Sequence, residues 1–386
     1  MLETKIPCTV VTGFLGAGKT TIIRNLLADL TASKGNRRIA LIINEFGDLG
    51  VDGEVLKGCG DETCTEDDIV ELTNGCICCT VADDFVPTIT ALLDRDDKPD
   101  HIVIETSGLA LPQPLVAAFN WPEIKPRVTV DGVVTVVDSA AVADGRFAHD
   151  EAALDAQRKA DDNLDHESPI EELFGDQIKC ADLIVLNKTD LVDADAMSKI
   201  RSTVEAEAKG RVKMVEAREG RLPASLLIGL ESGSEDDLSA RKSHHESHHE
   251  HHHHHHDDNH AHDHHHDDHD HDHHHGHHHH HDHDHDEFDS FVVSAGEVAD
   301  VETFRARLAE IIGEHDVLRL KGFVAVGGKP MRLTVQAVGT RIDAYFDGPF
   351  TGDRGTRLVV IGLAGLDRVA IGEAITAAAG SAAQAA

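Results

Sequence analysis

The stretch GFLGAGKT, residues 13–20, decides the fold of this chain of 386 residues. It matches the pattern G-x-x-x-x-G-K-[ST] at every fixed position, and it lies between an apolar run at residues 7–12 and a helical pattern at residues 20–30. Glycines in such a loop let backbone N–H groups surround phosphates, and the N-terminus of the following helix adds partial positive charge. The stretch therefore predicts a phosphate-binding loop between a buried strand and a helix. A glycine-rich turn without a ligand is the alternative.

Individual positions of this loop have expected roles. We expect Lys19 to reach the β- and γ-phosphates and to act in catalysis, and the Thr20 hydroxyl to bind Mg²⁺. The predicted nucleotide-binding residues of the loop are Gly13, Gly16, Ala17, Gly18, Lys19, Thr20 and Thr21.

Four further apolar runs predict buried strands, at residues 39–43, 101–105, 132–137 and 183–187. Near-continuous Val, Ile and Leu runs without polar alternation are typical of a parallel sheet that is covered on both faces. Helical stretches separate these runs, which is the pattern of a doubly wound fold. We therefore expect an α/β domain of the P-loop NTPase type, with a mostly parallel sheet, over residues 1–230.

The sequence N-K-T-D at residues 187–190 follows the last of these runs and matches the guanine-reading pattern N-K-x-D. The Asp190 carboxylate can accept hydrogen bonds from N1–H and N2–H of guanine, whereas adenine has an acceptor at N1 and no amine at C2. Asn187, Lys188 and Asp190 are therefore predicted to bind the nucleotide, and GTP is favoured over ATP. The alternatives are a chance turn and a small-molecule kinase that uses ATP.

The sequence E-T-S-G at residues 105–108 ends the predicted strand at residues 101–105. Ligands bind at this edge of such sheets, beyond the carboxyl ends of the strands. We expect Glu105 to bind Mg²⁺ through water or to position the attacking water, and the Gly108 N–H to sense the γ-phosphate. Both are predicted to be catalytic. A strand-end carboxylate that only makes local caps is the alternative.

Cys76, Cys78 and Cys79 place three thiols within four residues. Such a cluster suits a transition metal, and a reducing compartment favours metal-binding thiolates over disulfides. A structural zinc site is the alternative, but such sites have four ligands and no fourth is evident nearby. Cys59 and Cys64, upstream, could form a second site, assist the first or be loop thiols.

Residues 44–52, N-E-F-G-D-L-G-V-D, follow the second predicted strand, where a switch loop would lie. Glu45 is predicted to bind Mg²⁺ or to belong to this switch. A switch that contacts Mg²⁺ and the γ-phosphate and leads into the cysteine loop would couple metal affinity to the nucleotide state. A polar connection without such a role is the alternative.

The amino-acid composition divides the rest of the chain into two segments. Residues 244–285 hold 27 of the 31 histidines, with many carboxylates and no Lys or Arg. We expect residues 231–287 to be a disordered linker that binds divalent metals weakly at many sites, or else a spacer whose metal affinity is incidental. Residues 288–386 return to a globular pattern and predict a small α+β domain, with a hairpin turn at residues 327–330.

The net charge of −35 argues against a nucleic-acid partner, because a phosphate backbone requires a surface rich in Lys and Arg. No run approaches the roughly 20 apolar residues that span a bilayer, and the start of the chain has no signal-peptide pattern. We therefore expect a cytoplasmic protein with no membrane partner.

Together, residues 13–21, 44–47, 75–79, 105–108 and 187–190 resemble the CobW family of P-loop GTPases, in that order and at suitable spacings. The C-terminal part is similar to that family's C-terminal domain. Residues 57–68 and 121–123 are similar to the branch named for cobalamin biosynthesis. The resemblance implies that Cys76, Cys78 and Cys79 are metal ligands with Glu45 in the switch beside them.

The same resemblance implies a slow GTPase that uses GTP and Mg²⁺ and carries Co²⁺ to a metal-receiving protein, the cobaltochelatase of the aerobic pathway. Zn²⁺ or Ni²⁺ delivery is the alternative, because most sites bind both ions more tightly than Co²⁺. A protein that buffers metal ions with its histidine tract is the alternative from a different functional class. A homodimer is compatible with a metal chaperone and with a metal buffer.

Overall fold

The computed structural model describes most of the two globular parts of the chain. The described residues are 5–32, 38–44, 69–72, 85–148, 150, 154, 158–159, 169–208, 212–230, 232–238, 241, 288–339, 341–350 and 354–380.

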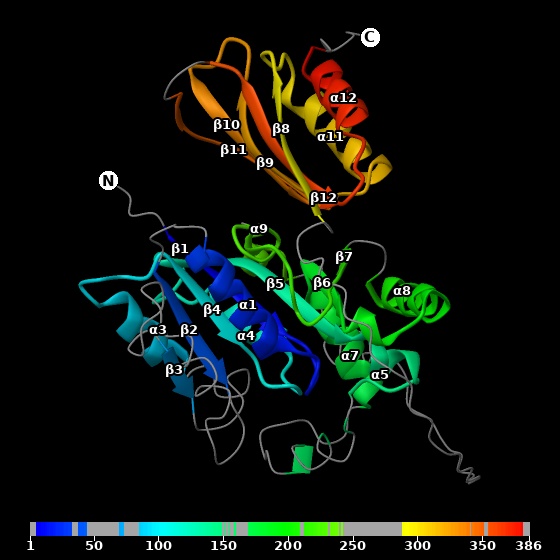
Figure 1. Cartoon of the computed structure of the whole chain (residues 1–386). Coiled ribbons are helices and arrows are strands. Elements are labelled where there is room, and N and C mark those ends of the chain that lie inside the picture. Colours follow the sequence, from blue (N-terminus) through cyan, green and yellow to red (C-terminus); the bar gives the residue numbers. More distant parts are fainter. Residues whose placement is uncertain are drawn as a thin grey trace, which may run out of the picture.

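The first domain is built on a seven-stranded sheet in the order β3-β2-β4-β1-β5-β6-β7, and every neighbouring pair is parallel (Figure 1). Its strands are β1 (Ile6–Thr12), β2 (Ile39–Asn44), β3 (Ile69–Leu72), β4 (His101–Glu105), β5 (Val128–Asp138), β6 (Leu183–Asn187) and β7 (Lys213–Glu216). The predicted doubly wound sheet is confirmed, and all five predicted strands are present. β3 and β7, four residues each, were not predicted.

Helices cover both faces of this sheet. They are α1 (Lys19–Ala32), α3 (Val86–Leu93), α4 (Pro112–Ala118), α5 (Ser139–Ala143), α7 (Ile170–Cys180), α8 (Ala194–Ala208) and α9 (Ala224–Leu227), with 3₁₀ turns η3 (Thr189–Leu191) and η4 (Ser234–Asp236). Successive strand residues serve opposite faces, since Val11 packs with α1 and Val10 with α3 and α4. Within the described residues, no helix is both long and apolar enough to cross a bilayer.

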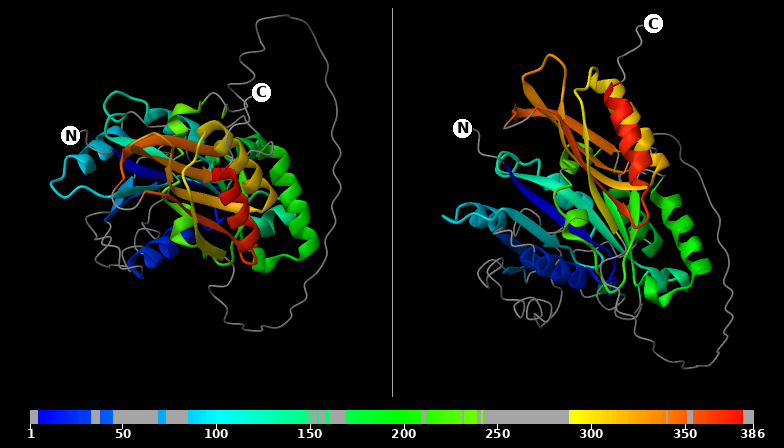
Figure 2. Two further views of the ribbon diagram at one scale, coloured as in Figure 1. Left: turned by 90° about the horizontal axis from the view of Figure 1, so that it is seen from above. Right: turned by 45° about the horizontal axis from the view of Figure 1, so that its top comes forward.

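The second domain is a five-stranded antiparallel sheet with two helices packed on one face (Figure 2). Its elements are β8 (Phe288–Ala295), α11 (Val301–Glu314), β9 (Val317–Ala325), β10 (Met331–Val338), β11 (Arg341–Pro349), β12 (Thr356–Leu363) and α12 (Arg368–Gly380), in the sheet order β11-β10-β9-β12-β8. The predicted α+β domain is confirmed. So is the turn between β9 and β10, where Gly328 has a φ of +73° and the Lys329 N–H donates to the Val326 carbonyl.

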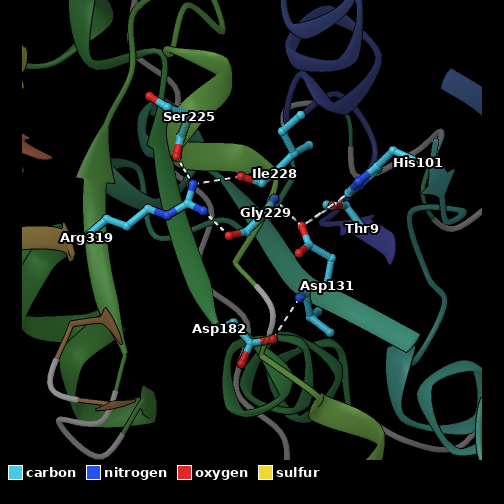
Figure 3. A network of polar contacts seen from close by, with 9 residues as sticks. Thr9, His101, Asp131, Asp182, Ser225, Ile228, Gly229 and Arg319 are labelled. Carbon is cyan, nitrogen blue, oxygen red and sulfur yellow. Dashed lines mark hydrogen bonds and ion pairs between the residues drawn. The ribbon is translucent and has the colours of Figure 1, made fainter. Parts of the chain in front are cut away.

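Arg319 of β9 joins the two domains (Figure 3). Arg319 is only 6% exposed, and its guanidinium donates to the carbonyls of Ser225, Ile228 and Gly229 around α9, at 2.7 Å for Ile228. Leu318 and Ile361, beside it on the second sheet, belong to the same apolar cluster as α1. The contact therefore combines apolar packing with a buried cation whose charge is shared among backbone carbonyls.

A buried polar chain continues from this contact into the parallel sheet (Figure 3). The Gly229 N–H donates to Asp131 Oδ2 at 2.5 Å, Thr9 Oγ1 donates to the same oxygen at 3.2 Å, and His101 Nε2 lies 2.8 Å from Thr9 Oγ1. Asp131 can reach these groups because β5 has a bulge where Cys8 and Thr9 of β1 face Val130 and Gly132. His101 is the first residue of β4 and Asp131 lies in the first half of β5, away from the strand ends that carry the phosphate loop.

Contacts of the first domain continue past the predicted boundary at residue 230. Arg241, 6% exposed, donates to Asp182 Oδ1 at 2.5 Å and to the Cys180 carbonyl, while Ser234 donates to Asp182 Oδ2 at 2.5 Å. Burial alone would raise the pKa of the Asp182 carboxyl, but the Arg241 charge and these hydrogen bonds outweigh it and lower the pKa. The segment after β7 therefore closes over the amino edge of the sheet.

Replacing Arg241 by Met is expected to lower the free energy of unfolding by about 3–5 kcal/mol, because it leaves the buried Asp182 carboxylate without its cation. Urea denaturation of the full chain measures this loss. Lys125→Met is the control, since Lys125 pairs with Asp236 at the surface and such a pair contributes at most about 1 kcal/mol. Equal losses in the two variants would contradict a structural role for the buried pair.

Candidate functional site

The phosphate loop lies directly after β1, where close backbone approach requires glycine. Gly13, Gly16 and Gly18 have φ angles of +137°, +76° and +101°, a region that L side chains rarely adopt. A Cβ at Gly13 would lie 2.2 Å from the Val136 carbonyl oxygen of β5. One at Gly18 would lie 2.3 Å from Asn187 Nδ2. The loop is thus a backbone cradle pressed between β5 and the end of β6, which fits phosphate binding at the start of a 14-residue helix.

Phe14 anchors this loop to the helical layer. Phe14 is 2% exposed, and its ring centroid lies 6.1 Å from that of Phe174 of α7 and 6.3 Å from that of Phe147, while the centroids of those two rings lie 4.9 Å apart. The next residue, Leu15, is 36% exposed. The loop therefore has one side chain fixed in the core and one at the surface, although the loop motif leaves both positions unspecified.

Side chains at the start of α1 face the end of β4. Thr20 Oγ1 donates to Glu105 Oε1 at 2.9 Å, and Glu105 is 5% exposed. A hydroxyl and a carboxylate are the oxygen ligands that suit Mg²⁺, so the donor set fits that ion. Lys19 Nζ donates to the carbonyls of Gly13 and Phe14, at 2.8 and 3.2 Å, and so lies across the loop. Thr21, partly buried, faces the Gly220 turn.

Gly108 lies against the phosphate loop from the side of β4. A Cβ there would lie 2.6 Å from the Leu15 backbone nitrogen, so the two backbones are in direct contact. Gln177 of α7, 1% exposed, holds this segment by donating to the carbonyls of Gly108 and Ala110, at 3.2 and 3.0 Å. The E-T-S-G segment is therefore fixed between the loop and α7.

The N-K-x-D turn follows β6. Asn187 is 2% exposed and joins two loops, because its Nδ2 donates to the Ala17 carbonyl at 2.9 Å and its Oδ1 accepts from the Gly220 N–H at 3.0 Å. Lys188 has a left-handed backbone, with φ +61° and ψ +34°, and its Nζ lies 2.5 Å from Asp138 Oδ2. Asp190, in η3, is exposed. In this geometry Asn187 braces the turn, and the Asp190 carboxylate is accessible to a base.

The structure thus brings Gly13 to Thr21, Glu105, Gly108 and the N-K-x-D turn to one edge of the sheet. The predicted metal ligands Cys76, Cys78 and Cys79, the switch residue Glu45, and Cys59, Cys64 and the histidine tract lie outside the described residues. Two other cysteines are described, Cys8 and Cys180, and both are buried. Burial raises the pKa of the Cys180 thiol to about 12.

Phe14, Gln177 and Asp138 contribute to this site and were not predicted. Asp138 had a signal that could have identified it, because it directly follows a predicted strand, as E-T-S-G begins at the end of another. Phe14 occupies an unspecified position of the loop motif. Gln177 lies mid-helix, 69 residues from the Gly108 that it contacts, and no local pattern indicates that contact.

Comparison with known proteins agrees with this geometry. Residues 7–216 match the family model described as CobW/HypB/UreG, nucleotide-binding domain, and residues 288–379 match the Cobalamin synthesis protein cobW C-terminal domain. A protein named zinc chaperone CobW from a Sinorhizobium species is 60% identical, with 97% of each chain covered. Another of that name from Pseudomonas aeruginosa is 48% identical, with 95% of this chain and 90% of the relative covered.

A third relative covers the nucleotide-binding part. The zinc-regulated GTPase metalloprotein activator 1 of Schizosaccharomyces pombe is 34% identical over 238 residues, which cover 61% of this chain and 51% of the relative. With the two family models matching both globular parts, the chain belongs to the CobW family of P-loop GTPases, a family of GTP-dependent metallochaperones.

Proposed function

We propose that this chain is a zinc chaperone that holds Zn²⁺ at Cys76, Cys78 and Cys79 in the GTP state and releases it to a recipient protein when GTP is hydrolysed. The observation that supports the proposal is that the predicted nucleotide-binding residues and the strands before the predicted metal ligands meet at one edge of the sheet. The phosphate loop, Glu105 and the strands that lead into the switch and cysteine segments all reach that edge.

The nucleotide half of the cycle follows from the described contacts. The glycine cradle and the start of α1 would hold the phosphates, with Lys19 on the β- and γ-phosphates and Asp190 on the guanine edge. Thr20 and Glu105 would hold Mg²⁺, which neutralises charge on the phosphate oxygens. Glu105 would orient the attacking water, and the Gly108 N–H would face the γ-phosphate.

Coupling to the metal rests on the order of the strands. β2 neighbours β4, and its last residue, Asn44, directly precedes Glu45. Leu72 ends β3, and Cys76 follows it by four residues, which span at most about 14 Å when extended. β3 lies three strand spacings from β1, also about 14 Å. The thiols can therefore lie close enough to the phosphates for one loop rearrangement to affect both.

The choice of zinc over cobalt draws on the relatives and on ligand chemistry. Two relatives that align over at least 90% of their own length, at 60% and 48% identity, are named as zinc chaperones. Thiolates bind Zn²⁺ more tightly than Co²⁺ in the usual first-row order. Cobalt, with the cobaltochelatase as recipient, is the rival that the sequence alone favoured.

A metal titration tests the proposal. We expect one tight Zn²⁺ site in the presence of GTP and Mg²⁺, measured by competition with a chromophoric chelator, and at least about tenfold weaker binding with GDP or without nucleotide, a coupling of the usual size for linked sites. Cys78→Ser should abolish the tight site, whereas Cys180→Ala, at a buried thiol, should keep it.

Two further arms of that titration separate the rivals. Deleting residues 244–285 should leave the tight site intact, and loss of all capacity would instead indicate a buffer. A parallel Co²⁺ titration, followed by thiolate-to-cobalt absorption, should give weaker binding than Zn²⁺; tighter binding would favour cobalt. Equal zinc affinity in all nucleotide states would contradict the chaperone cycle.

A further inference from the structure

Asp138 links two elements at the nucleotide edge through its two carboxylate oxygens. It is the last residue of β5 and its side chain is fully buried. Oδ1 accepts from the Ala141 N–H at 3.1 Å and so caps α5, while Oδ2 lies 2.5 Å from Lys188 Nζ. Asp138 and Asn187 are also partners in the register of β5 and β6. One side chain therefore ties α5 to the turn that follows β6.

That turn is held from three directions. Asn187 binds the phosphate loop through Ala17 and the next turn through Gly220. Lys188, 25% exposed, adopts left-handed backbone angles that a residue with a side chain rarely keeps unless its surroundings fix them. The backbone of Thr189 donates to the Ala217 carbonyl at 3.2 Å. Of these ties, only the Asp138 contact is an ion pair.

We propose that Asp138 is a positioning residue for guanine recognition: its ion pair fixes the Lys188 side chain and, through it, the turn that presents Asp190 to the base. The inference rests on the proposed use of GTP. None of the contacts of Asp138 described above is with the phosphate loop. Replacing Asp138 should therefore change how the base is recognised and leave phosphate binding unchanged. A purely structural helix cap would instead affect stability and not discrimination between bases.

Asp138→Asn separates these two roles, because Asn caps helices as well as Asp does but cannot form the ion pair. We expect the dissociation constants of GTP and GDP to rise about fivefold, the upper end for an ion pair with one partly exposed partner, while that of ATP stays the same. The ratio of ATP to GTP dissociation constants should fall by the same factor. Fluorescent nucleotide titrations of the full chain measure all three constants.

Two more variants make the result specific. Asp144→Asn changes an exposed acid at the end of the same helix, paired with Arg146 at 2.6 Å, and should leave every constant unchanged. Lys188→Met should lower discrimination as Asp138→Asn does, and the double variant should lose no more than either alone if Asp138 acts through Lys188.

The outcomes distinguish the inference from the function on which it rests. A wild-type chain without preference for GTP over ATP would overturn both. A wild-type preference that Asp138→Asn leaves intact, even with a lower melting temperature, would overturn the inference alone. Additive losses in the double variant would also overturn it, because Asp138 would then act independently of Lys188.

Discussion

Replacing Asp190 by Asn is expected to weaken GTP binding at least about 100-fold and to make xanthosine triphosphate the preferred nucleotide. The Asp190 carboxylate would accept from both N1–H and N2–H of guanine, and hydrogen bonds to charged groups contribute about 1.5–3 kcal/mol each. Asn keeps one acceptor oxygen, so one charge-assisted bond is lost and the other becomes a weaker neutral bond, a total of roughly 2.5–4.5 kcal/mol, or about two to three powers of ten in affinity. Xanthine has a carbonyl at C2, which can accept from the new amide.

Competition between fluorescent GTP and unlabelled nucleotides measures this change. Asp193→Asn is the matched control, because Asp193 lies just beyond the same turn and its Oδ1 caps α8 by accepting from the Ala196 N–H, a bond that Asn can keep. That variant should bind GTP normally. If Asp190→Asn retained its preference for GTP, guanine would have to be read elsewhere and the motif would be a chance turn.

The fold could be predicted where several consecutive residues are apolar, because such a run indicates a buried strand. β4 and β6 have the predicted bounds, because an unbroken apolar run requires cover on both faces. β3 and β7 have four residues each, too short for such a signal, and belong to the sheet through pairing with β2 and β6. Their position depends on tertiary contacts that no local pattern contains.

The contacts between the domains could not be predicted either, because they also join residues that are far apart in the sequence. Arg319 lies in the predicted α+β domain, but its burial depends on three carbonyls about 90 residues earlier in the chain. Asp131 is buried because of a bulge in β5, and its partner Thr9 is 122 residues away. A charged residue inside an apolar run indicates that it has a partner, but the sequence does not indicate which one.

The candidate site was predictable to the extent that chemistry fixes residue types at short spacing. The phosphate loop, Glu105 with Thr20, and Asn187 lie together as the motifs indicate. The residues that support the site are harder to predict, because many kinds of side chain can brace a loop. Gln177 and Phe14 are examples, and their roles emerge only when α7 is packed against the loop.

Gly13→Ala is expected to abolish measurable GTP binding and to lower the free energy of unfolding by more than about 3 kcal/mol. The new Cβ would lie 2.2 Å from the Val136 carbonyl oxygen and 3.1 Å from its carbon, both backbone atoms of the neighbouring strand. No side chain can move aside there, so the end of β1 must separate from β5, and those strands hold the loop. Nucleotide titration and urea denaturation measure the two losses.

Gly145→Ala is the control for a positive φ without a steric clash. Gly145 also has a left-handed backbone, with φ +74°, but a Cβ there would meet nothing within 4 Å. This control should lose only the cost of that conformation, about 1–2 kcal/mol, and should bind GTP normally. The excess loss in Gly13→Ala then reflects the close approach of β1 and β5 together with the less accessible φ of +137° at residue 13. Equal losses, with GTP binding kept in Gly13→Ala, would mean that glycine is required at residue 13 only for its dihedral angle, and the phosphate cradle would not depend on strand contact.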